Sequence, residues 1–195
     1  DQDTMQFDFE DLKSKITNNT KAIVVVHYGG IFSKYIIQLA KLCKKLDIFL
    51  IEDAAQSIGV KYNGKHLGTF GDLGCISFHN TKNIHCGEGG ALLINNSKLI
   101  KKCHMIRDHG TNRKDFKEKK VKSYTWCSLG SNYFISDYGA SFLYAQLKNI
   151  DLVNKKRISI WKKYYKNIID NNLYQKQKID IDDYLGNGHI FFLIF

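Results

Sequence analysis

Three residues in the first half of the chain could together hold and use a carbonyl cofactor. Lys82 lies in a polar stretch between two apolar runs, and a lysine amine held away from water is a nucleophile suited to imine chemistry. Asp53 follows another apolar run, and a carboxylate there could keep a pyridine nitrogen protonated, so that the ring accepts electrons. Ser77 precedes the lysine and could give its hydroxyl to a phosphate. These groups are the minimum apparatus for pyridoxal phosphate, although the spacing alone is a weak signal.

The segment that must position Asp53 is predicted to be a strand–helix–strand unit. Residues 22–26 are a continuous β-branched run, typical of a strand buried on both faces. Residues 33–46 have apolar positions at helical spacing, with Ser33 as a plausible N-cap, and residues 48–51 form the second strand. Asp53 then lies at the carboxyl end of a parallel strand, where ligands of α/β sheets bind. The alternative is a solvated strand end in which Asp53 caps the next turn.

Lys82 is predicted to lie between two further strands. An apolar run begins at Gly74, and a second run covers residues 91–94 after a glycine-rich exit. Glycines in that exit allow a positive φ or the close approach of a ligand to the backbone. The alternative interpretation is a hairpin whose lysine points into water.

The second half of the chain is predicted to be mainly helical. Residues 97–109 form a helix capped by Ser97, and the basic stretch 114–123 is an exposed loop. A long helical region begins at Ser136 and breaks near Asp151. The chain ends in a strand-like run from residue 188. Alternating strands and helices followed by a helical tail indicate the α/β class.

Composition excludes several classes of protein. The 195 residues suffice for one medium domain, and no stretch of about 20 apolar residues or leader-like N-terminus is present. The net charge of +10 comes from scattered lysines, which fit a pocket for an anionic small molecule at least as well as nucleic acid. Five irregularly spaced cysteines predict reduced thiols, neither a disulfide framework nor a metal site. We therefore expect a cytoplasmic protein that binds neither membrane nor nucleic acid.

Several linked stretches resemble the DegT/DnrJ/EryC1/StrS family of sugar aminotransferases. The motifs that carry the resemblance lie at residues 51–56, 68–72, 77–83, 87–90, 109–113, 124–126, 130–133, 145–147 and 187–192. Together they extend over nearly the whole chain in the family's order. They are most similar to the branch that makes dTDP-4-amino-4,6-dideoxygalactose.

The resemblance implies a pyridoxal phosphate-dependent transferase of fold type I, with a large domain like that of aspartate aminotransferase. That fold has a mostly parallel sheet with flanking helices. Residues 1–150 would be the central part of the large domain, and residues 151–195 a helical connection and the start of the small domain. Family members have a further N-terminal section with a phosphate-binding turn, and they continue past the His189 region. We therefore expect a fragment that is truncated at both ends.

The resemblance also implies a role for each site residue. Lys82 would form the internal aldimine and shuttle the proton between substrate and cofactor. Asp53 would pair with the pyridine nitrogen, Gln56 would contact the phenolic oxygen, and Ser77 would bind the phosphate. Asn132 would reach the phosphate of a neighbouring subunit, which makes the site one shared across a homodimer.

The implied reaction moves the amino group of L-glutamate to C4 of a dTDP-4-keto-6-deoxyhexose, for lipopolysaccharide or enterobacterial common antigen synthesis. Three alternatives stay open. The sugar nucleotide could be a different one. The chain could belong to relatives that dehydrate the sugar, in which a histidine replaces the lysine; Lys82 argues against this. It could also be an inactive truncated remnant, and we expect the 195-residue piece alone to be inactive.

Overall fold

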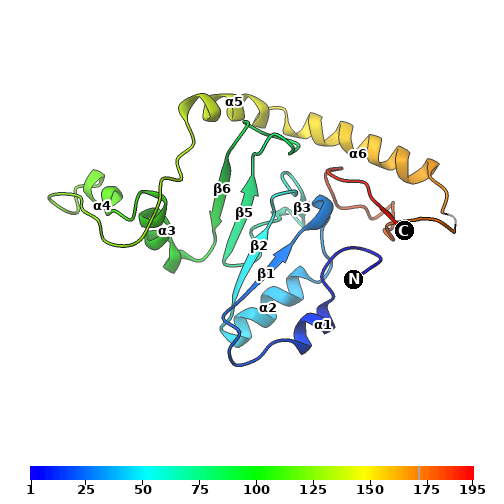
Figure 1. The fold of residues 1–195 in the computed structure, drawn as a ribbon, viewed down its shortest axis with the longest axis horizontal. Coiled ribbons are helices and arrows are strands. Elements are labelled where there is room, and N and C mark those ends of the chain that lie inside the picture. Colours follow the sequence, from blue (N-terminus) through cyan, green and yellow to red (C-terminus); the bar gives the residue numbers. More distant parts are fainter. Residues whose placement is uncertain (171) are drawn as a thin grey trace.

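The computed structural model describes residues 1–170 and 172–195 and is built around a four-stranded sheet (Figure 1). The strands, in their order across the sheet, are β1 (Ala22–Val26), β2 (Phe49–Asp53), β5 (Leu73–Ser77) and β6 (Gly90–Ile94). The first three are parallel, and β6 runs antiparallel to β5. The mostly parallel sheet predicted from the sequence is confirmed, and the loop that carries Lys82 joins the antiparallel pair.

Two helices cover one face of this sheet. They are α1 (Phe9–Ser14) and α2 (Ile36–Leu46). Alternate side chains of β1 and β2 point to this face, where Val25 and Leu50 pack with the apolar stripe of α2. The helix begins later than predicted, because Ser33 accepts the amide of Ile36 with its carbonyl oxygen and not with its side chain.

The other face of the sheet is open in the described part of the chain. Val24 is 62% exposed, and Val26, Phe49 and Leu92 also lie largely in solvent on this face. The prediction that residues 22–26 are buried on both faces is therefore wrong for this chain. Period-two alternation sends successive side chains to opposite faces, and described elements pack on only one of them.

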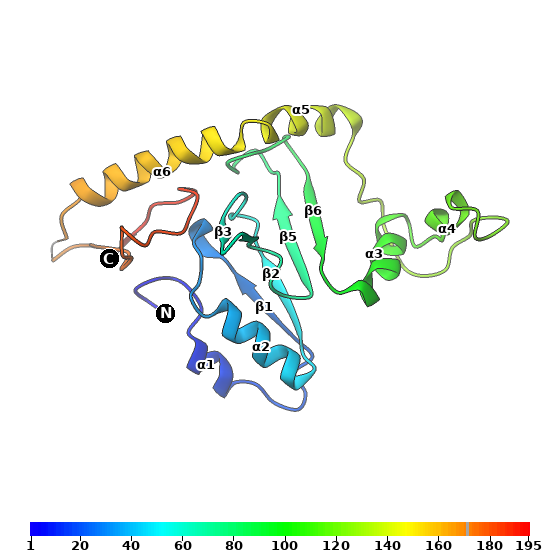
Figure 2. The ribbon, with the colours of Figure 1, turned by 180° about the vertical axis from the view of Figure 1, so that it is seen from behind.

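Two consecutive helices cross the edge of the sheet at which β5 ends (Figures 1 and 2). They are α5 (Asp137–Leu147) and α6 (Ile150–Asn167). Ser136 caps α5 as predicted, since its hydroxyl accepts the amide of Gly139. The break falls just before α6, slightly earlier than expected. Trp161 of α6 is 2% exposed and stacks on Tyr184, so the segment after α6 folds back beneath it.

A helical arm leaves the sheet after β6 (Figure 1). It contains the 3₁₀ turn η2 (Ser97–Leu99), α3 (Ile100–Arg107) and α4 (Arg113–Lys117). Asn96, and not Ser97, caps its start, because the Asn96 side chain accepts the amide of Lys98. The basic stretch predicted as a loop begins as the short helix α4, and the rest of it is exposed.

The remaining elements are short. They are the 3₁₀ turn η1 (Tyr28–Gly30), the hairpin of β3 (Lys61–Tyr62) and β4 (Lys65–His66), and the pair β7 (Gln175–Lys176) and β8 (Leu193–Ile194). The strand predicted from residue 188 is mostly wrong, because only β8 pairs while the preceding residues pack on α6. Of the helices described, none has the length and apolar character needed to cross a membrane.

Candidate active site

The strand register places Asp53 and Ser77 on the same, open face of the sheet. Asp53 is the partner of Cys75 across β2 and β5, and Ser77 lies two residues further along β5. Partners across a sheet and residues two apart on one strand share a face. Each residue is also the last of its strand, and β2 and β5 are parallel, so both side chains lie at the same edge of the sheet. The pKa of the Cys75 thiol is raised, first by burial and then by the negative charge of the nearby Asp53.

A buried carboxylate on the opposite face holds the loop after β4. Glu52 is fully buried and accepts hydrogen bonds from His27 Nε2 at 2.8 Å and from the amides of Gly68 at 2.9 Å, Phe70 at 2.6 Å and Gly71 at 2.7 Å. Burial alone would raise the pKa of Glu52, but the hydrogen bonds and the nearby imidazole outweigh it and hold the pKa below its usual value. This carboxylate, which precedes Asp53 directly and fixes the end of β2, was not predicted from the sequence to have a role of its own.

Gln56 is oriented by the turn that follows β1. Its Oε1 accepts the amide of Gly29 at 2.7 Å, and Gly29 has φ of 69°, which glycine adopts without strain. The Nε2 donors of Gln56 have no hydrogen-bond partner among the described residues. Asp53 is held in a comparable way, because its Oδ1 accepts the amide of Ala55 at 3.0 Å. Both side chains therefore keep a polar group for a ligand.

Lys82 lies in a loop that is closed by its own backbone and docked on α5. Its amide donates to the carbonyl of His79 at 2.9 Å, and the amide of Cys86 donates to the carbonyl of Phe78 at 2.9 Å. The His85 amide donates to Gln146 Oε1 of α5 at 3.2 Å. The Lys82 side chain is half-buried, and its Nζ has no hydrogen bond or ion pair within residues 1–170 and 172–195. The Lys82 side chain is therefore not fully exposed, and its amine is not engaged by a carboxylate of the described residues.

The residue after the lysine connects three distant segments. Asn83 is 7% exposed, and its side chain bonds to Asn154 of α6, to the carbonyl of Asn187 and to the ring of His189. Burial, followed by the charges of Lys82 and Arg157, lowers the pKa of His189 to about 4. No role was predicted for His189 from the sequence, because its contact with Asn83 arises only when the end of the chain folds back under α6.

Asn132 is not brought to the other predicted site residues. It lies on the arm, exposed, where its backbone pairs with Asp108 and its Oδ1 accepts the amide of Phe134 at 3.3 Å. Its predicted contact with the phosphate of a neighbouring subunit stays a prediction.

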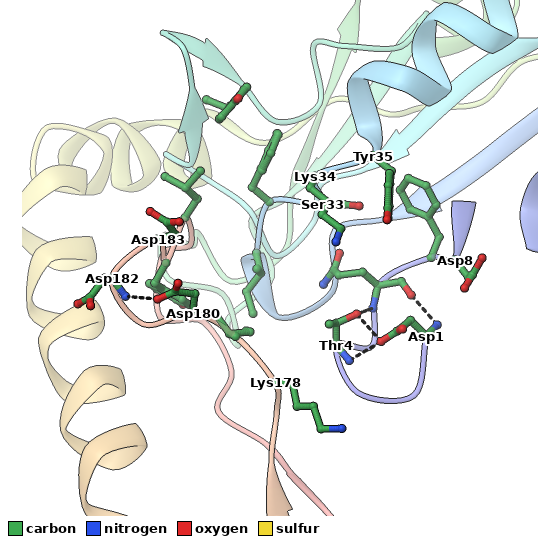
Figure 3. A pocket seen from close by; sticks show the side chains of 18 residues that line it. Asp1, Thr4, Asp8, Ser33, Lys34, Tyr35, Lys178, Asp180, Asp182 and Asp183 are labelled. Atoms are coloured by element: carbon green, nitrogen blue, oxygen red, sulfur yellow. Dashed lines mark hydrogen bonds between the residues drawn. The ribbon is translucent and has the colours of Figure 1, made fainter. Parts of the chain in front are cut away.

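A cavity of about 780 Å³ lies elsewhere, between the N-terminal segment and residues 178–185 (Figure 3). Neither Asp53, Ser77 nor Lys82 lines it. Its walls carry more acidic than basic side chains: Asp1, Asp8, Asp180, Asp182 and Asp183 against Lys34 and Lys178. Such a lining disfavours a phosphate, so the cavity is not the site predicted from the sequence.

The residues at the edge of the sheet fit pyridoxal phosphate. Asp53 can accept from a protonated ring nitrogen, and Gln56 has its Nε2 donors left over because its Oε1 is occupied. The Ser77 hydroxyl accepts the amide of His79 at 3.3 Å and can still donate its own proton to a phosphate. Lys82 supplies an amine without a competing partner. Asp53, Gln56 and Ser77 can bind and orient an electron-accepting ring and its phosphate. Lys82 can move a proton beside that ring.

Solved structures with the same fold are available for comparison. An aminotransferase of Helicobacter pylori involved in the biosynthesis of pseudoaminic acid superposes with a TM-score of 0.82 at 28% identity, over 95% of this chain and 48% of that chain. The aminotransferase TlmJ of Streptoalloteichus hindustanus has a TM-score of 0.87 at 22% identity, over 99% of this chain and 51% of that one, and shows the fold alone. The fold type predicted from the sequence is confirmed.

Curated sequences give the same result. The GDP-perosamine synthase of Escherichia coli O157:H7 is 35% identical over 178 residues, which are 91% of this chain and 46% of that protein. A UDP-4-amino-4,6-dideoxy-N-acetyl-beta-L-altrosamine transaminase of Campylobacter jejuni is 36% identical over 179 residues, 88% of this chain and 45% of that protein. This chain thus spans about half the length of these relatives. A model of the DegT/DnrJ/EryC1/StrS aminotransferase family matches residues 1–194, and the chain belongs to that family, whose cofactor is pyridoxal phosphate.

Proposed function

We propose that the enzyme built on this chain is an aminotransferase that moves the amino group of L-glutamate to C4 of a nucleotide-linked 4-keto-6-deoxyhexose. The observation that carries the proposal is the site at the edge of the sheet: Asp53 and Ser77 share one face, and the neighbouring loop presents Lys82 without a partner. Residues 1–150 would supply this part of the large domain, and residues 151–195 would lead into the small one.

Each side chain would have one task. Bound pyridoxal phosphate supplies an electron sink for the pair released when a Cα–H bond breaks. Asp53 would hold the proton at the ring nitrogen, and Gln56 would donate from Nε2 to the phenolic oxygen. Ser77 would donate its hydroxyl to the phosphate. Lys82 Nζ would carry the proton between the substrate carbon and the cofactor.

The sugar nucleotide is proposed from two kinds of support. The name of the Campylobacter relative places an amino group at C4, which supports amination at that carbon. The net charge of +10 suits a diphosphate-linked substrate. The resemblance favours dTDP, whereas the names of the curated relatives carry GDP and UDP. The experiment must therefore decide which nucleotide the sugar substrate carries. The product would serve lipopolysaccharide or enterobacterial common antigen synthesis in the cytoplasm.

A homodimer with a shared site belongs to the same proposal. The arm that carries Asn132 also exposes large apolar side chains: Trp126 is 78% exposed and Leu129 is 93% exposed, and Tyr138 at the start of α5 is 90% exposed. An apolar surface of this kind supports contact with another subunit. Because Asn132 lies away from Asp53 and Lys82 within one chain, it would reach the site only from a second subunit. We also propose that the 195-residue chain alone is inactive.

The test is a transfer assay on the whole enzyme with ¹⁵N-labelled glutamate and the dTDP-, GDP- and UDP-linked 4-keto-6-deoxyhexoses. We expect ¹⁵N in one amino sugar, and Lys82→Arg should lower its formation by at least ~10³-fold, because the arginine side chain stays protonated. Lys98→Arg, on the exposed arm, is the matched control and should keep full activity. A deoxygenated sugar without ¹⁵N would instead indicate a dehydratase, and no product from any sugar would refute the proposal.

A further inference from the structure

Three asparagines from distant parts of the chain meet in one buried cluster. Asn83 follows Lys82 directly, Asn154 lies in α6, and Asn187 lies in the segment that returns beneath α6. They are 7%, 8% and 1% exposed, and a buried amide is stable only when its polar atoms find partners. The partners of these three side chains therefore show which parts of the chain are held together here.

Asn187 is the centre of this cluster. Its Nδ2 donates to the carbonyl oxygens of Gln56 at 2.9 Å and of Ile58 at 3.1 Å, and its own carbonyl accepts from Asn83 Nδ2 at 3.0 Å. Asn154 closes the cluster, because it donates to the same Ile58 carbonyl at 3.0 Å and accepts from Asn83 at 3.1 Å. One residue therefore contacts both the turn after β2 and the loop between β5 and β6.

Asn187 also holds the turn that orients the Gln56 side chain. Its backbone amide donates to the carbonyl of Gly30 at 3.3 Å, and the amide of Gly29 donates to Gln56 Oε1 at 2.7 Å. The packing is close, because a Cβ on Gly30 would overlap both Asn187 Oδ1 and the carbonyl oxygen of Gln56. The backbone and the side chain of Gln56 are therefore both fixed in relation to Asn187.

The chemistry of these contacts requires an amide at position 187. Both oxygens that face Nδ2 are backbone carbonyls, which accept and cannot donate, so the group between them must carry two hydrogens. The Asn187 Oδ1 then faces Gly30 and has no hydrogen-bond partner in the described part of the chain. A carboxylate in the same place would repel both carbonyls, and a hydroxyl could donate to only one of them.

We propose that Asn187 is a positioning residue that holds the turn of Gln56 and the loop of Lys82 in a fixed relation. It acts on Gln56 directly and on Lys82 through Asn83, the next residue in the chain. Its role toward pyridoxal phosphate rests on the proposed function, in which Gln56 and Lys82 contact the cofactor. The hydrogen bonds themselves do not, and they can be measured without cofactor or substrate.

The first measurement is hydrogen exchange in the cofactor-free whole protein, followed by peptide mass spectrometry. Asn187→Asp should make the protected amides of residues 55–60 and 79–86 exchange about tenfold faster, the size expected for the loss of a buried hydrogen bond. Both segments should respond, because a carboxylate repelled by two carbonyls moves residue 187 away from each of its partners.

Tyr165→Phe is the matched control. It removes one hydrogen bond between α6 and the same returning segment, the one from the Tyr165 hydroxyl to the carbonyl of Ile179. That bond reaches neither Gln56 nor Lys82, so residues 55–60 and 79–86 should stay as protected as in the parent protein.

The second measurement is the dissociation constant of pyridoxal phosphate, read from its visible absorbance in the whole enzyme. We expect Asn187→Asp to weaken binding at least ~10-fold and Tyr165→Phe to leave it unchanged, even though both variants unfold at lower urea. Asn187→Ser keeps one donor and should give the same two changes at a smaller size. It takes the place of Asn187→Asp if that variant does not fold.

Faster exchange in residues 55–60 alone would refute the positioning role. Cofactor binding that is unchanged in Asn187→Asp, or that weakens equally in Asn187→Asp and Tyr165→Phe, would refute it as well. If exchange and cofactor binding respond as expected but the enzyme transfers no amine from glutamate, the proposed function alone has failed.

Discussion

At the scale of single residues, the site depends on polar groups that already have most of their partners. Gln56 is held through Oε1 and keeps its Nε2 donors for a ligand, whereas Asn83 is held through every polar atom of its side chain and joins the loop to distant segments. Glu52 is the extreme case, since a fully buried carboxylate survives only with several donors around it. Its loss would free the end of β2 on which Asp53 lies.

Glu52→Gln is expected to lower the free energy of unfolding at pH 7 by ~3 kcal/mol, because an amide turns an NH₂ group toward donors that need an acceptor. The pKa of Glu52 is lower in the folded than in the unfolded state. Its contribution is therefore fully present above the unfolded value of about 4.3 and is lost as the pH falls through the folded value.

Urea unfolding across the acidic range measures both effects. The gap between the parent protein and Glu52→Gln should narrow only below about pH 4. Glu10→Gln is the control, because Glu10 forms an exposed ion pair with Lys13 and should change stability by less than ~0.5 kcal/mol. A gap that stays constant down to the acid limit would contradict the assignment.

At the scale of elements, the sheet and the loops beside it fit through close backbone contacts. β5 can lie next to the loop after β4 only because residue 74 lacks a side chain: a Cβ on Gly74 would stand 2.1 Å from the carbonyl oxygen of Gly68. The same loop supplies all three backbone amides that donate to Glu52 among the described residues. Packing of β5 and the hydrogen bonds of Glu52 are therefore coupled.

Gly74→Ala is accordingly expected to destabilise the protein by ~3 kcal/mol, since backbone atoms must move to make room. Gly64→Ala is the matched control: nothing lies within 4 Å of its Cβ position, and only its φ of 77° carries a cost, ~1 kcal/mol. Thermal unfolding of the two variants gives the comparison. Equal melting temperatures would show that the contact between Gly74 and Gly68 is not tight in solution.

At the scale of the whole molecule, the sheet site and the arm lie apart (Figure 1). Lys82 is in the loop under α5, whereas Asn132 is on the arm beside Asp108. A single chain therefore does not assemble all the residues that the family resemblance implies, and the proposed dimer would bring them together across an interface.

Mixing two inactive variants of the whole enzyme tests this arrangement. Lys82→Ala and Asn132→Ala should each lose activity alone, and after co-refolding about a quarter of the sites should be intact, because half of the dimers are mixed and each has one complete site. Activity of the mixture should rise toward that fraction of the unmutated enzyme. A mixture no more active than its components would contradict a shared site, and Lys82→Ala mixed with itself is the control.

The sequence by itself determined the local elements and the order of the chemical groups. Apolar runs predicted β1, β2, β5 and β6, because period and side-chain type are properties of neighbouring residues. Motifs around Asp53, Ser77 and Lys82 predicted the family and its cofactor. Helix starts were shifted, as at Ser33 and Ser97, because a turn or a neighbouring asparagine supplied the first acceptor instead.

Only the tertiary structure decided which face of the sheet is open, that Glu52 collects four hydrogen bonds, and that the ring of His189 contacts Asn83. Asn83 and His189 are 106 residues apart, and nothing in the local pattern of either segment indicates that they meet. Strand register and the return of the chain under α6 create that contact. Local propensity acts over a few residues, whereas a hydrogen bond between distant segments depends on how the whole chain packs.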